Sequence, residues 1–312
     1  MEKTPEIELR GIRALRGSYE ALLDVNLSLY GGETLFAMGG AGSGKSVLIK
    51  TAAGITLPAE GEVLFRGKSM AKMSEREEAA FRKASGFVFQ DAALWANLTL
   101  YDNLALSARL HSPEWSKAEL DRAVRRAAEV VGYEDDLRVR PVELSAGERK
   151  LIGLARGLVL DPELLFMDDP TAELDEASAA RVFDIVDALK ARGRSVFVTS
   201  GVSDFASRCA DRVAALIGGR LAAWGSYAEA AAWTDPSVRL VTGRLKSRSS
   251  APKQDWEEGL AGAWAAAIAE DSGPLPDAAS SEGDRGGEVL GDIINDLAGD
   301  EGEPSDENKD GS

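Results

Sequence analysis

The stretch Gly39-Gly40-Ala41-Gly42-Ser43-Gly44-Lys45-Ser46 decides the fold of this 312-residue chain. It fits the pattern G-x-x-x-x-G-K-[ST], with an apolar run before it (33–38) and a helix-compatible run after it (45–53). In such a strand, loop and helix, the glycines let backbone amides turn towards phosphate oxygens, and the lysine supplies a cation. The stretch therefore predicts a phosphate-binding loop rather than a plain Gly-rich turn.

An apolar strand that ends in acids follows more than a hundred residues later. Residues 164–167 (LLFM) lead directly into Asp168 and Asp169. Beside a phosphate loop, a strand-end carboxylate and the serine hydroxyl of the loop are the groups that hold Mg²⁺. An acidic strand end alone is common, but together with the loop it predicts Ser46 and Asp168 as metal ligands.

Strands and helices alternate along most of the chain. This order predicts an α/β fold with a mainly parallel sheet, whose ligands lie at the carboxyl ends of the strands. Residues 7–30 predict an antiparallel β piece, and residues 113–160 show helical spacing that predicts an inserted helical subdomain over about 92–160. The remaining predicted elements are a strand over 86–89, a helix over 182–189, a strand over 195–199, and a hairpin over 213–224.

Charge divides the chain into a body and a tail. The net charge is −16, yet residues 255–312 contain 17 acids and 2 bases, so the rest is close to neutral. We predict a folded body over 1–235 and an acidic, mostly disordered tail over 236–312. The phosphates of a nucleic acid would repel this tail, so no nucleic-acid partner is expected. Apolar spacing predicts short partner-docking helices near 256–268 and 289–298, although incidental apolar residues in a solvated tail explain it equally well.

Single copies of cysteine and histidine exclude several kinds of site. Cys209 cannot form an internal disulfide, and His111 cannot build a multi-histidine metal centre. We expect His111 on the surface of the helical subdomain. The chain lacks a run of about 20 apolar residues, and the residues after Met1 lack the apolar stretch of a signal peptide, which predicts a soluble, cytoplasmic protein.

A second short motif precedes an apolar helix. Residues 144–148 (LSAGE) place Ser145 and Glu148 at the spacing of a helix capping box, which alone indicates only a helix start. The order of phosphate loop, Gln90, this motif, Asp168 and a strand to Ser200 is more specific. In that order, roughly residues 5–230 resemble the ATP-binding subunits of ABC transporters, which are P-loop NTPases.

Two stretches are most similar to the ATPases of Mce/Mla-type lipid transporters. One is residues 42–50 (GSGKSVLIK), and the other is residues 89–94 (FQDAAL) with 98–103 (LTLYDN). In that family the second stretch contacts the membrane subunit. The resemblance therefore implies a subunit that powers lipid transport from the inner face of the membrane.

The resemblance also implies the site. ATP and Mg²⁺ would be the cofactors, and the partners would be a second ABC ATPase subunit, identical or different, and an integral membrane permease. The implied nucleotide-binding residues are Gly39, Gly40, Ala41, Gly42, Ser43, Gly44, Lys45, Ser46 and Gln90. The implied metal ligands are Ser46, Gln90 and Asp168, and the implied catalytic residues are Asp169, Gln90, Lys45 and Ser200. Ser145, Ala146, Gly147 and Glu148 would face the nucleotide of the opposite subunit, and Asp175 would cross the dimer interface.

Three departures from the family pattern bear on hydrolysis. Asp169 stands where the family has glutamate, so its carboxylate reaches one methylene less far, and small misplacements cost rate. Ser200 stands where the family has histidine, and Ala146 and Glu148 replace glycine and glutamine. An alternative function is thus that of a nucleotide-binding, poorly hydrolysing subunit that acts as the regulatory or degenerate partner in an ABC heterodimer. The adenine-stacking residue stays open between Tyr19 and Arg16.

Overall fold

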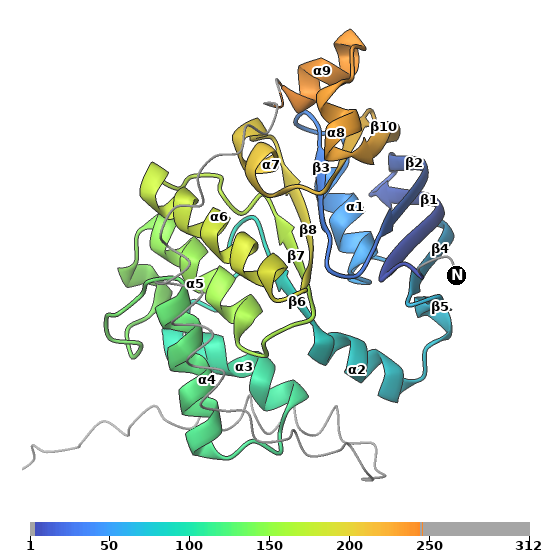
Figure 1. Ribbon diagram of the computed structural model, residues 1–312. Helices are drawn as coiled ribbons and strands as arrows, with labels where there is room; N and C mark the ends of the chain where they lie inside the picture. The colour runs from blue at the N-terminus through green and yellow to red at the C-terminus, as the bar shows by residue number, and fades with distance from the viewer. Residues whose placement is uncertain (1–3, 244, 246–312) are drawn as a thin grey trace, which may run out of the picture. The chain divides into compact units, whose positions relative to one another are not determined.

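A six-stranded sheet carries the phosphate loop and the strand-end acids (Figure 1). The structure is a computed structural model that describes residues 4–243 and 245. The strand order is β10-β9-β3-β8-β7-β6; neighbours from β9 to β6 pair in parallel, and β10 pairs antiparallel with β9. The predicted, mainly parallel α/β sheet is confirmed. Its strands are β3 (Thr34–Met38), β6 (Ser85–Val88), β7 (Leu164–Asp168), β8 (Ser195–Ser200), β9 (Arg212–Ile217) and β10 (Arg220–Ser226).

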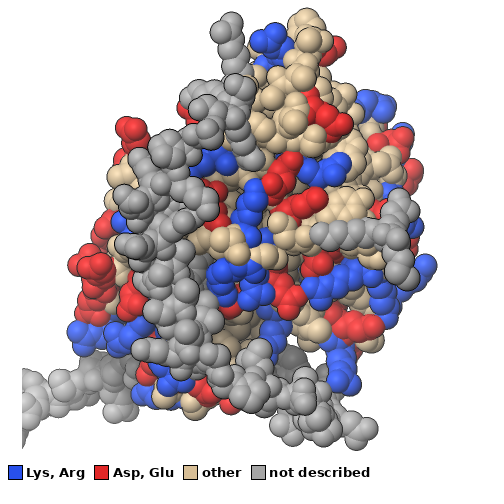
Figure 2. Space-filling model, viewed as in Figure 1, with Lys and Arg blue, Asp and Glu red and all other residues tan. Residues whose placement is uncertain are grey.

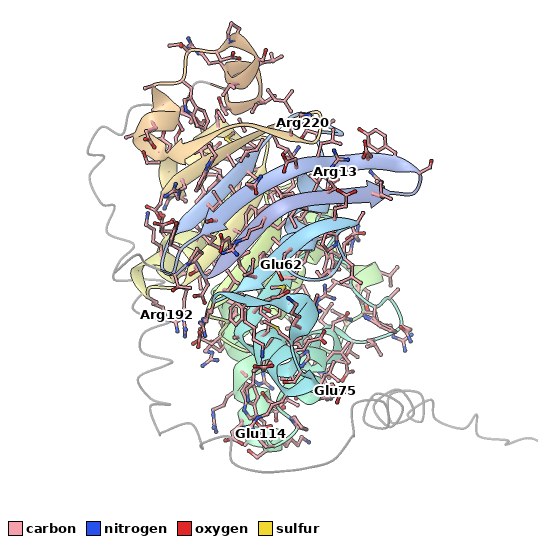
Figure 3. The ribbon with its side chains drawn as sticks, turned by 90° about the vertical axis from the view of Figure 1, so that its right-hand side faces the viewer. Arg13, Glu62, Glu75, Glu114, Arg192 and Arg220 are labelled. Carbon is pink, nitrogen blue, oxygen red and sulfur yellow. The ribbon has the colours of Figure 1, made fainter. Side chains whose placement is uncertain are left out.

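A separate four-stranded antiparallel sheet has the order β2-β1-β4-β5. The predicted β piece supplies β1 (Ile7–Arg16) and β2 (Tyr19–Leu29), whereas β4 (Glu60–Phe65) and β5 (Lys68–Ser69) were not predicted. Figure 3 looks onto this sheet, with Arg13 on β1 and Glu62 on β4. Polar side chains on one face and a buried apolar face are usual for antiparallel sheets.

Three helices lie within the segment predicted as a helical subdomain: α3, α4 and α5. The helices are α1 (Lys45–Ala52), α2 (Glu75–Ala84), α3 (Leu100–His111), α4 (Lys117–Val130), α5 (Ala146–Leu158), α6 (Glu176–Ala191), α7 (Ser203–Cys209), α8 (Tyr227–Ala231) and α9 (Pro236–Thr242). Short 3-10 turns occupy Met70–Lys72 and Pro141–Glu143. Within residues 4–243 and 245, every helix is too short or too polar to cross a bilayer.

Alternate residues of the central strands serve two apolar cores. On β7, Leu165 and Met167 pack into the core shared with α3 to α7, whereas Leu164 and Phe166 pack into the core shared with α1 and the antiparallel sheet. A strand buried on both faces needs apolar residues at every position, as found in parallel sheets. Side chains of β7 pack into both cores, so the backbone that carries the Asp168 carboxylate is fixed on both faces of the sheet.

The folded part continues beyond the predicted boundary at residue 235. Helix α9 begins there because the Asp235 carboxylate accepts hydrogen bonds from the N–H groups of Ser237 and Val238, and Pro236 occupies the first turn. Val238 and Thr242 are buried, so this helix belongs to the body. The segments near 256–268 and 289–298 lie outside the described residues.

Charges of both signs are intermixed over the face shown in Figure 2. Ion pairs on the surface of the described part of the chain include Lys68 with Glu77 and Lys83 with Glu114. This mixture is consistent with the near-neutral charge of the body.

Cys209 lies fully buried at the end of α7. Burial raises the pKa of its thiol far above the ordinary value. We expect the folded protein to react with a thiol reagent such as DTNB only on unfolding, at least about 100-fold more slowly than the same chain in denaturant, because the thiolate is the reactive form. A rapid reaction of the folded chain would contradict this burial.

Candidate functional site

The phosphate loop runs from the end of β3 to the start of α1, and glycine is required at both of its ends. A Cβ atom on Gly39 would lie 2.4 Å from the Ser43 Oγ and 2.5 Å from the Leu216 carbonyl oxygen. Gly44 has φ +100°, and a Cβ there would lie 2.5 Å from the Ala21 carbonyl oxygen. The loop therefore follows a path that only these glycines permit.

Two polar groups of this loop are suited to phosphate. The Lys45 Nζ curls over the loop and donates to the carbonyl oxygens of Gly39 at 2.7 Å and Gly40 at 3.0 Å. The Ser43 Oγ is buried without a hydrogen-bond partner in the described part of the chain. A nearby cation, a buried hydroxyl that lacks a partner and the N-terminus of α1 fit an anionic phosphate.

The predicted metal ligands Ser46 and Asp168 meet in space. The Ser46 Oγ donates to the Asp168 Oδ1 at 3.1 Å, and the Thr199 Oγ1 donates to the same oxygen at 2.7 Å. The Asp168 side chain is only 2% exposed. Hydroxyl and carboxylate oxygens are the ligands that Mg²⁺ prefers, so this pair fits the ion.

Asp169 begins the loop that follows β7. Its backbone is left-handed, with φ +46°, and its N–H donates to the carbonyl oxygen of Thr199 at 2.9 Å. The pKa of its carboxyl group is raised, because burial outweighs the opposing effect of the nearby cations Lys150 and Lys45. The Asp169 side chain is therefore half-buried and close to Lys45 of the phosphate loop.

Gln90 comes two residues after β6 and lines a cavity of about 330 Å³ together with Asp168. The proximity follows from the parallel pairing of β6 with β7, which brings the carboxyl ends of both strands to one edge. The other lining residues are Lys50, Asp91, Ala92, Ala146, Arg149, Lys150 and Glu173. Among the lining residues, the sequence analysis assigned roles to Gln90, Ala146 and Asp168 but to neither Lys50 nor Lys150.

The segment after Gln90 is held by helix α5. Ala92 and Ala93 are both left-handed, with φ +61° and +48°, and the Arg156 guanidinium donates to both of their carbonyl oxygens at 2.6 Å. A Cβ atom on Gly153 would lie 3.0 Å from Ala92, so the helix and the segment touch. Arg156 and Gly153 were not predicted, because only the folded chain brings them to this segment.

The predicted capping box at the start of α5 is present. The Ser145 Oγ accepts from the N–H of Glu148 at 3.2 Å, and the N–H of Ser145 donates to the Glu148 carboxylate at 2.7 Å. These bonds hold the pKa of Glu148 below its usual value. Gly147 lies beside Leu174, since a Cβ on it would be 3.7 Å from that side chain. The negative charge of Glu148 therefore lies at the N-terminus of α5, where its carboxylate accepts the Ser145 N–H.

Ser200 and Asp175 have local partners in this structure. The Ser200 side chain is fully buried, and its Oγ accepts from the N–H of Val202 at 3.0 Å. Asp175 is the N-cap of α6, where its carboxylate accepts from the N–H of Ser178 at 2.7 Å. Their catalytic and interfacial roles stay predictions.

Tyr19 and Arg16 lie opposite each other at the turn between β1 and β2, and the Tyr19 side chain is exposed. Both therefore remain candidates for stacking on the adenine base. His111 differs from the expected surface residue: it is half-buried at the end of α3 and lines a cavity of about 180 Å³ with Arg82. Burial lowers the pKa of its imidazole, and the cations Arg82 and Lys83 lower it further.

Comparison with known proteins identifies the family. The sequence profile of the ABC transporter family matches residues 22–172. The chain is 34% identical to an uncharacterized ABC transporter ATP-binding protein, MJ1508, from Methanocaldococcus jannaschii, over 62% of this chain and 88% of that protein. It is 32% identical to the cell division ATP-binding protein FtsE of Escherichia coli, over 67% and 93%. It is 35% identical to the probable ribonucleotide transport ATP-binding protein mkl of Mycobacterium leprae, over 58% of this chain and 52% of that protein.

Solved structures agree with these relatives. The dimeric, post-hydrolysis structure of the ATP-binding cassette MJ0796 bound to ADP and Pi superposes with a TM-score of 0.65 and 25% identity. The alignment covers 70% of this chain and 98% of that one. CbiO1 of Clostridium perfringens, part of the ABC transporter complex cbiONQ, superposes with a TM-score of 0.63 and covers 76% of this chain.

These relationships confirm the predictions of the P-loop fold, of ATP hydrolysis, and of ATP with Mg²⁺ as cofactors. They also support the predicted partners, a second ATPase subunit and a membrane permease. They do not single out the Mce/Mla lipid subtype, since the relatives carry other names. The chain belongs to the family of ABC transporter ATP-binding proteins.

Proposed function

We propose that the chain powers lipid transport as the ATPase of an Mce/Mla-type complex, bound to the inner face of the cell membrane through its permease. The main support for the proposal is the position of the segment that follows Gln90, residues 91–95. It leaves the nucleotide site, is fixed to α5, and reaches Trp95, whose side chain is 53% exposed. An exposed indole at the end of a rigid segment suits contact with a partner, and the segment's sequence is similar to that of the lipid transporters.

Each residue of the site has a role in this proposal. Lys45 binds the outer phosphates. Ser46 and Asp168 would hold Mg²⁺, which would supply positive charge beside the phosphates. Asp169 orients the attacking water and accepts its proton. Gln90 contacts this water, and the segment that follows Gln90 connects the nucleotide site to the permease. The remaining nucleotide contacts are backbone amides of the 39–46 loop.

The site is completed by a second ATPase subunit. Ser145 and Gly147 lie at the N-terminus of α5, where the helix dipole favours phosphate. We place them on the outer phosphate of ATP held by the opposite subunit, with Asp175 crossing the interface. ATP binding then joins the subunits, and hydrolysis separates them.

A second candidate function is a partner that binds ATP but turns it over slowly. Two observations favour it: the shorter carboxylate of Asp169, and the buried Ser200 Oγ, which already accepts the Val202 N–H. The double variant Asp169→Glu with Ser200→His separates the two functions. A rise in kcat of about 10-fold or more shows that these two positions limit turnover, whereas an unchanged kcat removes this candidate.

The transport substrate is tested on the assembled complex. The tagged chain is purified from its native membrane together with its permease and placed in lipid nanodiscs, and its ATPase rate is measured with added phospholipid or with added ribonucleotides. The proposal predicts at least about threefold stimulation by phospholipid and none by ribonucleotides, with Lys45→Ala as the blank. Stimulation by ribonucleotides alone, or copurification without a permease, would overturn it.

A further inference from the structure

Lys150 is a buried lysine at the centre of the site. It is the fifth residue of α5, its side chain is 7% exposed, and it lines the cavity that holds Gln90 and Asp168. Its Nζ donates to the carbonyl oxygen of Asp169 at 3.4 Å and to that of Ala172. Buried lysines are rare unless their ammonium is paired, so this arrangement calls for a reason.

The two carbonyls belong to the first and last residues of one turn. The N–H of Ala172 donates to the Asp169 carbonyl oxygen at 3.3 Å, which closes the turn. The turn starts with the left-handed Asp169, and the left-handed Glu173, with φ +67°, follows it. Left-handed conformations cost free energy for residues other than glycine, so they persist only where surrounding contacts hold them.

The turn is held from two sides. On one side, the N–H of Asp169 donates to Thr199 on β8. On the other side, Lys150 reaches from α5 to both ends of the turn. Burial lowers the pKa of the Lys150 ammonium, and the charges of the nearby acids Glu173, Asp169, Asp168 and Asp91 offset only part of this effect. A neutral side chain would leave the carbonyl oxygens of Asp169 and Ala172 without the hydrogen bonds that Lys150 donates.

Helix α5 therefore connects two functional elements. Its first turn carries Ser145 and Gly147, and its second turn carries the lysine that holds the turn of Asp169. We propose that Lys150 is a positioning residue that fixes the Asp169 carboxylate for hydrolysis and ties it to the signature motif of the same subunit. The proposal deepens the proposed function and rests on the role given there to Asp169.

The test compares the full-length chain with Lys150→Met, which removes the donors at similar length, and Lys150→Arg, which keeps the charge and the donors. The kcat of Lys150→Met is expected to fall at least about 10-fold, with the Kd for the fluorescent analogue MANT-ATP within twofold, because a misplaced acid slows the reaction without removing phosphate contacts. Lys150→Arg should recover kcat to within about threefold of the unchanged chain.

The matched control is Lys83→Met. It removes another hydrogen-bonded lysine, one that pairs with Glu114, and should leave kcat within twofold. Lys150→Gln is a second neutral variant, and the same split between kcat and Kd is required of each variant that folds by circular dichroism. A kcat within twofold for the neutral variants, or equal losses in kcat and nucleotide affinity, overturns the proposal. If Asp169→Asn keeps its activity, the catalytic role proposed for Asp169 is wrong, and this failure is distinct from a failure of the role proposed for Lys150.

Discussion

Replacement of Asp169 by asparagine is expected to lower kcat by about 10²- to 10⁴-fold while the affinity for ATP stays within about threefold. An amide has nearly the shape of the carboxylate but cannot accept the proton of the attacking water, and general-base catalysis contributes a factor of this size. The proposed phosphate contacts are made by Lys45 and the loop before it and not by Asp169, so binding should persist. Single-turnover hydrolysis and MANT-ATP titration of the same preparations separate the two quantities.

Asp169→Glu is the matched control for this prediction. It keeps the acid and extends it by one methylene, so it should retain at least the kcat of the unchanged chain. The backbone of residue 169 is held by Thr199 and Lys150 in either case, which limits other changes. If Asp169→Asn keeps more than about a third of the turnover, another group activates the water and the assignment of Asp169 is wrong.

Replacement of Gly44 by alanine is expected to disrupt the phosphate loop. The added Cβ would lie 2.5 Å from a backbone oxygen of β2, that of Ala21, and φ +100° is strained for any residue except glycine. Strain of this kind costs about 1–3 kcal/mol, which corresponds to a fall in the thermal midpoint of roughly 2–10 °C for a body of this size. ATP affinity should fall at least about 10-fold, because the loop must move to relieve the clash.

Gly40→Ala tests the same loop without the clash. No atom of the described chain lies within 4 Å of a Cβ at this position, and its φ is ordinary. The thermal midpoint should therefore stay within about 1 °C of the original, as is usual for exposed sites. Equal loss of stability in the two variants would mean that loop flexibility, and not the close approach to β2, explains the requirement for glycine.

The sequence predicted the parts of the site whose chemistry depends on residues close together in the chain. The loop before Lys45 needs glycines at fixed spacing. Asp168 ends a strand whose other residues are all apolar because both of its faces are buried. The capping box of Ser145 is likewise confined to four consecutive residues. Such features depend on neighbours in the chain, so a pattern in the sequence identifies them.

The missed features depend on contacts between distant segments. Helix α2 is polar, and Phe81 is its single buried residue among the described side chains, so its apolar periodicity is weak, although its capping box of Ser74 and Glu77 was readable. Lys150 and Arg156 resemble solvent-facing residues of a helix. Their burial follows only from the turn of Asp169 and the left-handed alanines, which pack against α5 from elsewhere in the chain.

The ATPase role is tested by the steady-state ATPase rate of the purified full-length chain in Mg-ATP, with Lys45→Ala as the blank and molecular mass measured in parallel. We expect turnover that requires Mg²⁺, vanishes in Lys45→Ala, and rises more than linearly with protein concentration as dimers form. Tight MANT-ATP binding without turnover would contradict a motor role for this chain and favour the slowly hydrolysing partner. Turnover that persists in Lys45→Ala would contradict the site itself.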